Sequence, residues 1–250
     1  MLRVTLYDIK IENRSLYLGT LWKVLTPLIQ IGTYWFVFGI GLRRGAPVDG
    51  YPFLVWLLGG MIPWFFFSRS ITTGAMSIRS KSAMVFKVKY PIPTIPIGNT
   101  IKCLYDHVIM IGIMTVIFLF HGVTPNLYWL NLLYYLFFAF IFLACLSLTL
   151  SITVMLAQDL GNLINSLMQL LFFLTPIFWK PDGLSPSAQR LFSLNPAFYI
   201  VNGFRDSLLY RVNFFSHPLR MIIFWTMTLI LFFAGCSIQK RYGKRIIDWL

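Results

Sequence analysis

The chain has 250 residues, of which 58% are hydrophobic and only 12% are charged, and its formal net charge is +13. A soluble domain carries about twice that charged fraction. The composition therefore excludes an ordinary soluble domain and predicts an all-α integral membrane protein, with residues 1–250 forming a single domain. The Lys and Arg residues lie beside the apolar segments, which is how membrane topology is set, so we expect no nucleic-acid partner.

The first segment, residues 1–23, is amphipathic. Arg3, Lys10 and Arg14 share one helical face, and Leu2 and Leu6 lie on a neighbouring face. Charged residues interrupt this stretch, so it has no apolar core of a signal peptide. The pattern predicts an N-terminal interface helix that lies on the inner membrane surface and contacts lipids.

Six apolar segments follow, and each is long enough to cross a bilayer. The six predicted transmembrane helices cover roughly residues 24–41, 53–73, 100–120, 130–157, 162–178 and 221–238.

The basic residues set the orientation of these helices. Twelve Lys and Arg residues lie in the predicted inner segments, whereas the two short outer loops hold only Arg43 and Arg44. An excess of positive charge marks the cytoplasmic side. We therefore expect a multi-pass protein of the cytoplasmic membrane with both termini in the cytoplasm.

A basic linker, residues 76–96, separates the second and third predicted spans. Four basic residues and no acid occur between Arg79 and Lys89, and Pro91, Pro93 and Pro96 oppose a continuous helix. One interpretation is a short cytoplasmic helix on which another protein can push. The other is an ordinary positively charged inner loop without a partner.

The segment 181–217, between the fifth and sixth predicted spans, has a different composition. Its apolar pieces are too short to span a membrane, and prolines and charged residues interrupt them. Such a segment is typical of re-entrant helices that enter the membrane and return on the same side. A loop lying on the outer surface fits the pattern equally well.

Polar and aromatic side chains follow helical spacing along the fifth predicted span, and Gln30 and Tyr34 form a weaker stripe on the first. Polar groups that face lipid are costly, so these stripes should face protein or water. One interpretation is a path for a polar substrate, and the other is helix–helix or dimer contact. The candidate path residues are Gln30, Tyr34, Asn162, Asn165, Ser166, Gln169, Phe172 and Phe173.

The sequence holds no catalytic motif and no Cys or His spacing of a metal site, so no catalytic, cofactor-binding or metal residue is predicted. A GxxxxGK[ST] motif is absent as well, so the chain does not bind a nucleotide through a P-loop. If ATP drives the protein, a separate subunit must hydrolyse it.

Several stretches resemble the permease subunits of type-2 ABC exporters for cell-surface polysaccharides. They are ENRSLYLGTLWKVLTPLIQ, GGMIPWFFFSRSITTGAMSI, KVKYPIPTIP, and FFLTPIFW followed by LNPAFYIVNGFRDSLL. Within that family, IQIGTYWFVFGIGLRRGAPVDGYPF is most similar to Gram-positive teichoic acid translocation permeases.

The resemblance implies partners that the residues alone do not. Two copies of the chain would pair with two ABC ATPase subunits, which bind ATP and Mg, and a lipid-linked anionic polysaccharide would pass between the copies. The linker would be the coupling helix, with Met76, Arg79, Lys81, Met84, Phe86, Lys87, Lys89 and Tyr90 as its ATPase-coupling residues.

The resemblance also implies that the re-entrant segment gates the outer side, with Arg190, Asn195, Arg205 and Asp206 as gate residues. Arg43, Arg44, Arg205 and Arg211 offer cationic stations for an anionic polymer. For Arg205, pairing with Asp206 is an equally good explanation.

The leading functional hypothesis is therefore ATP-driven export of lipid-linked wall teichoic acid. Export of O-antigen or capsular polysaccharide is the alternative within the same class. A stand-alone scramblase or carrier is a third hypothesis, and a membrane enzyme is disfavoured because no acid/base pair is present.

Overall fold

The computed structural model describes residues 19, 21–82 and 91–242, and these residues are almost entirely helical. Five helical segments within this part of the chain are long and apolar enough to cross a membrane, which describes a multi-pass membrane protein. They are α2 with its π-helical continuation η1 (Leu21–Leu42), α3 (Phe53–Ala75), α6 (Thr94–Phe120), η2 with α7 (Leu127–Leu156) and α11 (Pro218–Tyr242).

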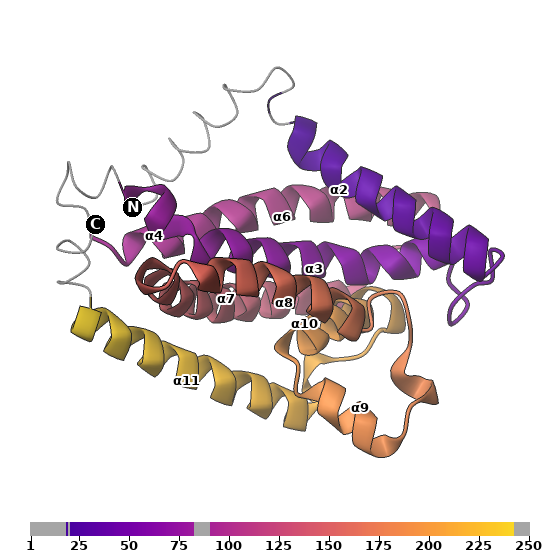
Figure 1. Ribbon diagram of the computed structural model, residues 1–250. Helices are drawn as coiled ribbons and strands as arrows, with labels where there is room; N and C mark the ends of the chain where they lie inside the picture. Colours follow the sequence, from indigo (N-terminus) through magenta and orange to yellow (C-terminus); the bar gives the residue numbers. More distant parts are fainter. Residues whose placement is uncertain (1–18, 20, 83–90, 243–250) are drawn as a thin grey trace.

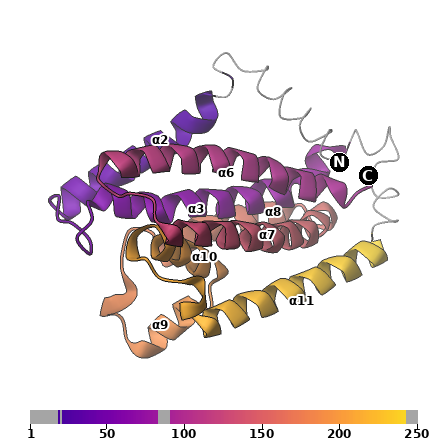
Figure 2. The same ribbon diagram turned by 180° about the vertical axis from the view of Figure 1, so that it is seen from behind.

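Helix α3 lies in the middle of the bundle, with α2 and α11 on opposite outer sides (Figures 1 and 2). It contacts α2, α6, α7, α8 (Asp159–Leu174) and α10 (Pro196–Arg205). Side chains such as Val55, Leu57 and Met61 are fully buried on it. A helix that is apolar on all sides is stable only when other helices surround it, and α3 satisfies this condition.

The bundle has two ends. At one end, which we call the loop end, lie the connections 43–52 and 121–126; at the other, the linker end, α3 finishes, α6 begins and α11 finishes (Figure 1). The loop 43–52 turns tightly through Arg44, Asp49 and two glycines with positive φ, and an isolated bridge joins Val48 to Tyr51.

At the linker end, the described part of the basic linker is anchored to the bundle. After α3, the chain forms α4 (Ser77–Ser80), and Ile78 is fully buried in a cluster with Ile92, Ile95 and Ile152. Pro93 precedes α6 and Pro96 lies in its first turn, where the missing N–H needs no partner. Helix α6 therefore begins at Thr94, beside these prolines, and not near residue 100, where we expected the third span to begin.

The fifth predicted span differs from its expected extent of 162–178. Helix α8 covers Asp159–Leu174, which at 1.5 Å per residue is about 24 Å and short of a bilayer core of about 30 Å. Pro176 has no N–H to continue the helix, and Thr175–Phe178 are buried without being helical. A sixth span remains a prediction beside the five that the described residues provide.

The outer segment divides into two unlike halves. Helix α9 (Pro186–Ser193) has no buried residue, whereas eight of the ten residues of α10 are buried. Helix α10 packs against α3 and α7, and the π-helical turn η4 (Asp206–Tyr210) continues it. That this segment is re-entrant stays a prediction. Of the predicted interface helix 1–23, residues 1–18 and 20 lie outside the described residues, and 21–23 belong to α2.

We predict that Gly203→Ala destabilises the protein, because a Cβ at this position of α10 would collide with the ring of Tyr135 on α7. Overpacking of this kind costs about 1–3 kcal/mol. Thermal unfolding in detergent measures the effect. Gly112→Ala on α6 is the matched control, since its Cβ would meet nothing within 4 Å; equal melting temperatures for the two variants would contradict the prediction.

Candidate functional site

A groove of about 700 Å³ lies between α2, α3 and α8. Helix α2 contributes Gln30 and Tyr34, which are four residues apart and therefore share a face. Helix α8 contributes Asn165 and Gln169 by the same spacing. Gln30, Asn165 and Gln169 are exposed, so their amide groups are free to meet a polar ligand.

Aromatic side chains line the part of the groove nearer the loop end. The ring of Phe172 lies 5.0 Å from that of Tyr34 and 5.8 Å from that of Trp64, centroid to centroid. Phe178, just after α8, stacks on Phe38 at 4.6 Å and lies 5.5 Å from Phe172 in a tilted arrangement, centroid to centroid. These contacts join α2, α3 and α8 across the groove. The groove is thus amide-lined toward the linker end and aromatic toward the loop end.

Of the eight predicted path residues, six line this one groove, and two do not. Asn162 and Ser166 are exposed on α8 outside the lining, and the Ser166 hydroxyl donates to the backbone carbonyl of Asn162 at 3.1 Å. Trp64, Phe65, Ser68, Thr72 and Met168 also line the groove and were not predicted. That these residues contact a substrate stays a prediction.

The predicted ATPase-coupling residues are only partly described. Met76 ends α3, and its Sδ would lie 2.8 Å from a Cβ added to Gly161, so this glycine lets the start of α8 approach the linker. Arg79 lies in α4 and Lys81 just after it, and both are half-buried. Met84, Phe86, Lys87, Lys89 and Tyr90 lie outside the described residues.

Two of the four predicted gate residues hold the non-helical stretch after α8. Asn195 donates through Nδ2 to Thr175 Oγ1 at 3.0 Å, and its Oδ1 caps α10. Arg205 donates through Nη1 to the Pro176 carbonyl at 2.6 Å, through Nη2 to the Ile177 carbonyl, and through Nε to the Trp56 carbonyl at 3.3 Å. Its guanidinium also lies 3.6 Å from the centroid of the Trp56 ring.

This geometry favours a structural role for Arg205 over that of a cationic station. Its side chain is only 3% exposed and its guanidinium donates to backbone carbonyls, so it offers no free surface to a polymer. The expected pairing partner, Asp206, instead has a carboxylate oxygen 3.5 Å from His217 Nε2. Arg190 is exposed on α9, and Arg211 is exposed with a positive φ.

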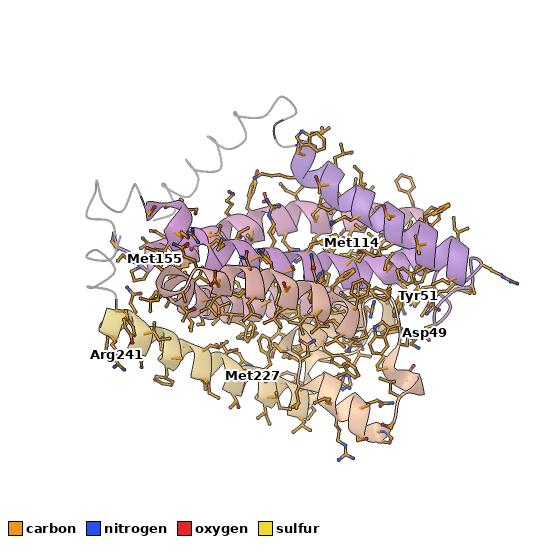
Figure 3. All side chains as sticks on the ribbon, viewed as in Figure 1. Asp49, Tyr51, Met114, Met155, Met227 and Arg241 are labelled. Atoms are coloured by element: carbon orange, nitrogen blue, oxygen red, sulfur yellow. The ribbon has the colours of Figure 1, made fainter. Side chains whose placement is uncertain are left out.

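A polar network at the loop end joins the 43–52 loop to the outer segment. Asp49 accepts from Lys180 Nζ at 2.7 Å and from the Tyr210 hydroxyl at 2.6 Å, and Tyr51 donates to the Leu209 carbonyl at 2.6 Å. Asp49 and Tyr51 lie together at this end of the bundle (Figure 3). The hydrogen bond from Lys180, followed by that from Tyr210, lowers the pKa of Asp49. By contrast, burial raises the pKa of Asp206 to about 6.

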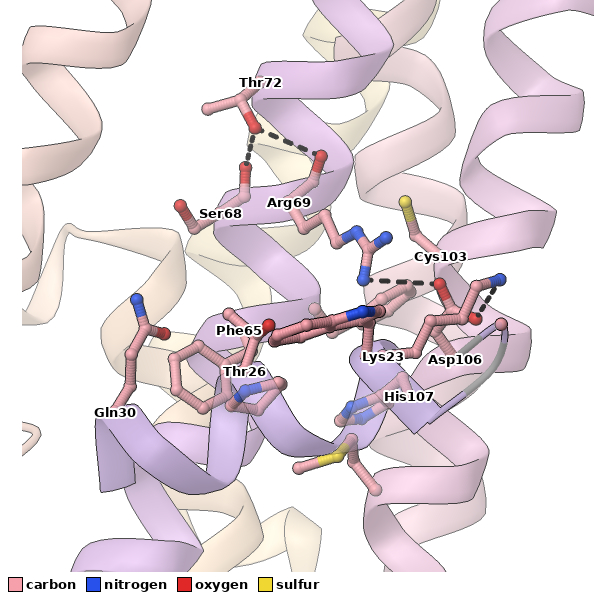
Figure 4. Close-up of a pocket in the computed structure, with 15 residues that line it drawn as sticks. Lys23, Thr26, Gln30, Phe65, Ser68, Arg69, Thr72, Cys103, Asp106 and His107 are labelled. Carbon is pink, nitrogen blue, oxygen red and sulfur yellow. Dashed lines mark hydrogen bonds and ion pairs between the residues drawn. The ribbon is translucent and has the colours of Figure 1, made fainter. Parts of the chain in front are cut away.

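An ion cluster between α2, α3 and α6 was not predicted. Lys23 Nζ lies 3.0 Å from Asp106 Oδ1, and Arg69 Nη1 lies 3.3 Å from Asp106 Oδ2 (Figure 4). The sequence offered one signal, an acid inside an apolar segment, but not its partners, because Lys23 and Asp106 are 83 residues apart.

We predict that Arg205→Lys lowers the free energy of unfolding by about 3 kcal/mol, because a lysine cannot reach three carbonyls in this geometry and buried acceptors are left unpaired. Thermal unfolding in detergent measures this loss. The exposed Arg190→Lys is the matched control and should change stability by less than about 0.5 kcal/mol. Since both variants keep their charge, an unaffected Arg205→Lys would restore the cationic-station interpretation.

We predict a gain in stability between pH 7 and pH 5 that depends on Asp206. Its folded-state pKa of about 6 lies above the ordinary value of 3.8, so the folded state binds a proton that the unfolded state does not, and stability rises as the pH falls. His217, whose pKa burial lowers, acts in the opposite direction.

Melting temperatures of the wild type and Asp206→Asn across this range measure the difference. The variant should be the more stable at pH 7 and should lose the pH-dependent gain. Asp182→Asn, at an exposed carboxylate, is the control. Identical pH profiles for the wild type and Asp206→Asn would refute the assignment.

Comparison with known proteins gives a consistent family. Residues 7–209 match the family model described as ABC-2 type transporter. The chain is 26% identical over 253 residues to the O-antigen export system permease protein RfbA of Myxococcus xanthus, covering 96% of this chain and 91% of that protein. It is 25% identical to a protein of the same name from Klebsiella pneumoniae, covering 99% and 93% of the two chains. The family match covers well over half of the chain, which therefore belongs to the ABC-2 type transporter family.

Proposed function

We propose that the chain is the transmembrane subunit of an ATP-driven exporter that moves a lipid-linked cell-surface polysaccharide across the cytoplasmic membrane. Relatives that align over nearly their whole length are named O-antigen export permeases, which supports this class of cargo. The single structural observation that carries the proposal is the groove whose amides and rings lie on α2, α3 and α8. Amides suit sugar hydroxyls, and aromatic rings suit the apolar faces of sugars.

The groove supports a pair of permeases. Its exposed amides would be costly if they faced acyl chains, so the face of α2 and α8 that carries them requires protein or water opposite. A second copy related by twofold symmetry would present the same face and close the groove into a conduit. We therefore propose a homodimer of permeases with the substrate between them.

ATP-driven export requires a separate subunit that hydrolyses ATP, because this chain has no P-loop. Two ABC ATPase subunits, which bind the ATP and Mg, fit membership of the family. We propose that they dock on the linker 76–96, and that this linker and both termini lie on the cytoplasmic side. The buried Ile78 attaches the described start of this linker to α6 and α7. A force that the ATPase applies to the linker would therefore be transmitted to these helices.

We propose two candidates for the exported polymer, wall teichoic acid and an O-antigen-like polysaccharide. Similarity of residues 29–53 to teichoic acid permeases supports wall teichoic acid. The names of the relatives support O-antigen, and they rest on alignments over nearly the whole chain. We therefore give O-antigen-like polysaccharide at least equal weight as the cargo. A stand-alone scramblase or carrier is the third candidate, and it requires transport without ATP.

We predict that Gln169→Trp reduces polymer export at least tenfold, because the larger side chain fills the amide-lined part of the groove. Surface polymer on cells that depend on this permease is the measurement, with the polymer identified chemically. Leu229→Trp, which adds comparable bulk at an exposed site on α11, is the control and should export normally.

Affinity purification of the same proteins tests whether each of them still binds an ABC ATPase. An ABC ATPase should copurify with the wild type, Gln169→Trp and Leu229→Trp alike, so that a transport defect is separated from lost assembly. Normal export by Gln169→Trp would reject the groove as the path. Transport by purified wild type in vesicles without any ATPase would favour the stand-alone carrier.

A further inference from the structure

A second cavity, of about 480 Å³, lies between α2, α3 and α6. It touches the groove along Gln30, Phe65, Ser68 and Thr72 but has a different chemistry, because it contains the ion cluster of Lys23, Arg69 and Asp106 (Figure 4). Neither the family match nor the relatives assign a role to these residues. We refer to it as the inner cavity.

The charges of the described residues that line the inner cavity do not balance. Among them, two cations, Lys23 and Arg69, share the carboxylate of Asp106, which leaves one excess positive charge. The side chains of Lys23 and Asp106 are 9% and 7% exposed, whereas that of Arg69 is 41% exposed. The excess positive charge therefore falls on Arg69, whose partly exposed guanidinium can contact an additional anion in the cavity.

Two polar atoms in the lining are incompletely satisfied. His107 Nε2 is buried and has no hydrogen-bond partner among the described residues. The His107 ring is fixed by stacking on Phe66 at 4.7 Å and by contact with Phe204 at 5.7 Å, centroid to centroid. Asp106 Oδ2 has its ion-pair contact with Arg69 but no well-aligned hydrogen bond. Arg69 is therefore held loosely enough to take a second partner.

The cavity lies near the linker-end boundary of the hydrocarbon core, slightly deeper than the usual level of the lipid headgroups. A bilayer core of about 30 Å corresponds to about 20 helical residues, which counted from the loop end puts its far boundary near residue 73 of α3 and residue 100 of α6. Arg69 and Asp106 then lie about 6 and 9 Å inside that boundary. Trp22, which lines the cavity and is 42% exposed, suits the same interfacial level.

We propose that the inner cavity binds the phosphate group of an anionic membrane lipid. Arg69 and Lys23 would contact the phosphate oxygens by charge-assisted hydrogen bonds. Asp106 is the competing anion that holds both cations in place when the site is empty. The lipid chains would leave the cavity toward the bilayer. The proposal does not depend on which polymer the protein exports.

Two kinds of lipid share this chemistry, a phospholipid and a polyprenyl phosphate. The test measures binding of phosphatidylglycerol and of undecaprenyl phosphate to the purified protein by native mass spectrometry. A galactolipid without phosphate serves as the lipid control, and inorganic phosphate serves as a soluble competitor. Tighter binding of one phosphate lipid than of the other identifies the source.

The substitutions should change the affinity for phosphate lipids in opposite directions, whereas a purely structural ion cluster would not produce opposite changes. Arg69→Gln and Lys23→Gln should each weaken phosphate-lipid binding about tenfold relative to the wild type. Asp106→Asn should strengthen it several-fold, because the competing carboxylate is gone. Arg190→Gln, at an exposed arginine on α9 near the opposite end of the bundle, should bind as the wild type does.

Three results would overturn the proposal. They are unchanged binding in Arg69→Gln, weaker binding in Asp106→Asn, and binding of inorganic phosphate without any preference for lipid. Melting temperatures without added lipid show whether each variant is folded. If Lys23→Gln does not fold, lipid binding by Arg69→Gln, at a half-exposed position, and by Asp106→Asn still tests the proposal.

Discussion

The structure depends on how the backbone is satisfied where α8 stops inside the bundle. Pro176 prevents the chain from continuing the helix, so the buried residues after α8 have backbone carbonyls without helical partners. Arg205 donates to the carbonyls of Pro176 and Ile177 while its guanidinium covers Trp56. Gly60 allows the approach, because a Cβ there would lie 3.1 Å from the Ile177 carbonyl oxygen. One buried side chain thus joins α3, the end of α8 and α10.

This arrangement connects the groove with both ends of the bundle. At the linker end, Gly161 lets the start of α8 approach Met76, and Ile78 fixes α4 against α6 and α7. At the loop end, Asn195 and Arg205 hold the residues that follow α8. Helix α8 therefore carries the groove residues Asn165 and Gln169 between two attachments. The described start of the linker, α8 and the outer segment are thus connected by direct contacts.

Charge is distributed differently at the two sides of the bundle. The loop end uses paired charges, since Asp49 is bound by both Lys180 and Tyr210. Among the described residues, the inner cavity is lined by two cations and one carboxylate. The part of the groove lining that the structure describes carries amides and rings and no charged side chain.

The sequence by itself determined the membrane class, most of the helices and the polar stripes on α2 and α8. Hydrophobic length and helical spacing are local properties, and they are sufficient for these conclusions. The tertiary structure decided what the isolated charges do. Arg205 was expected to meet substrate or Asp206 but holds carbonyls, and Asp106 unites Lys23 and Arg69 from two other helices. Such partners are set by how helices distant in sequence pack together, and no periodicity within one segment contains that information.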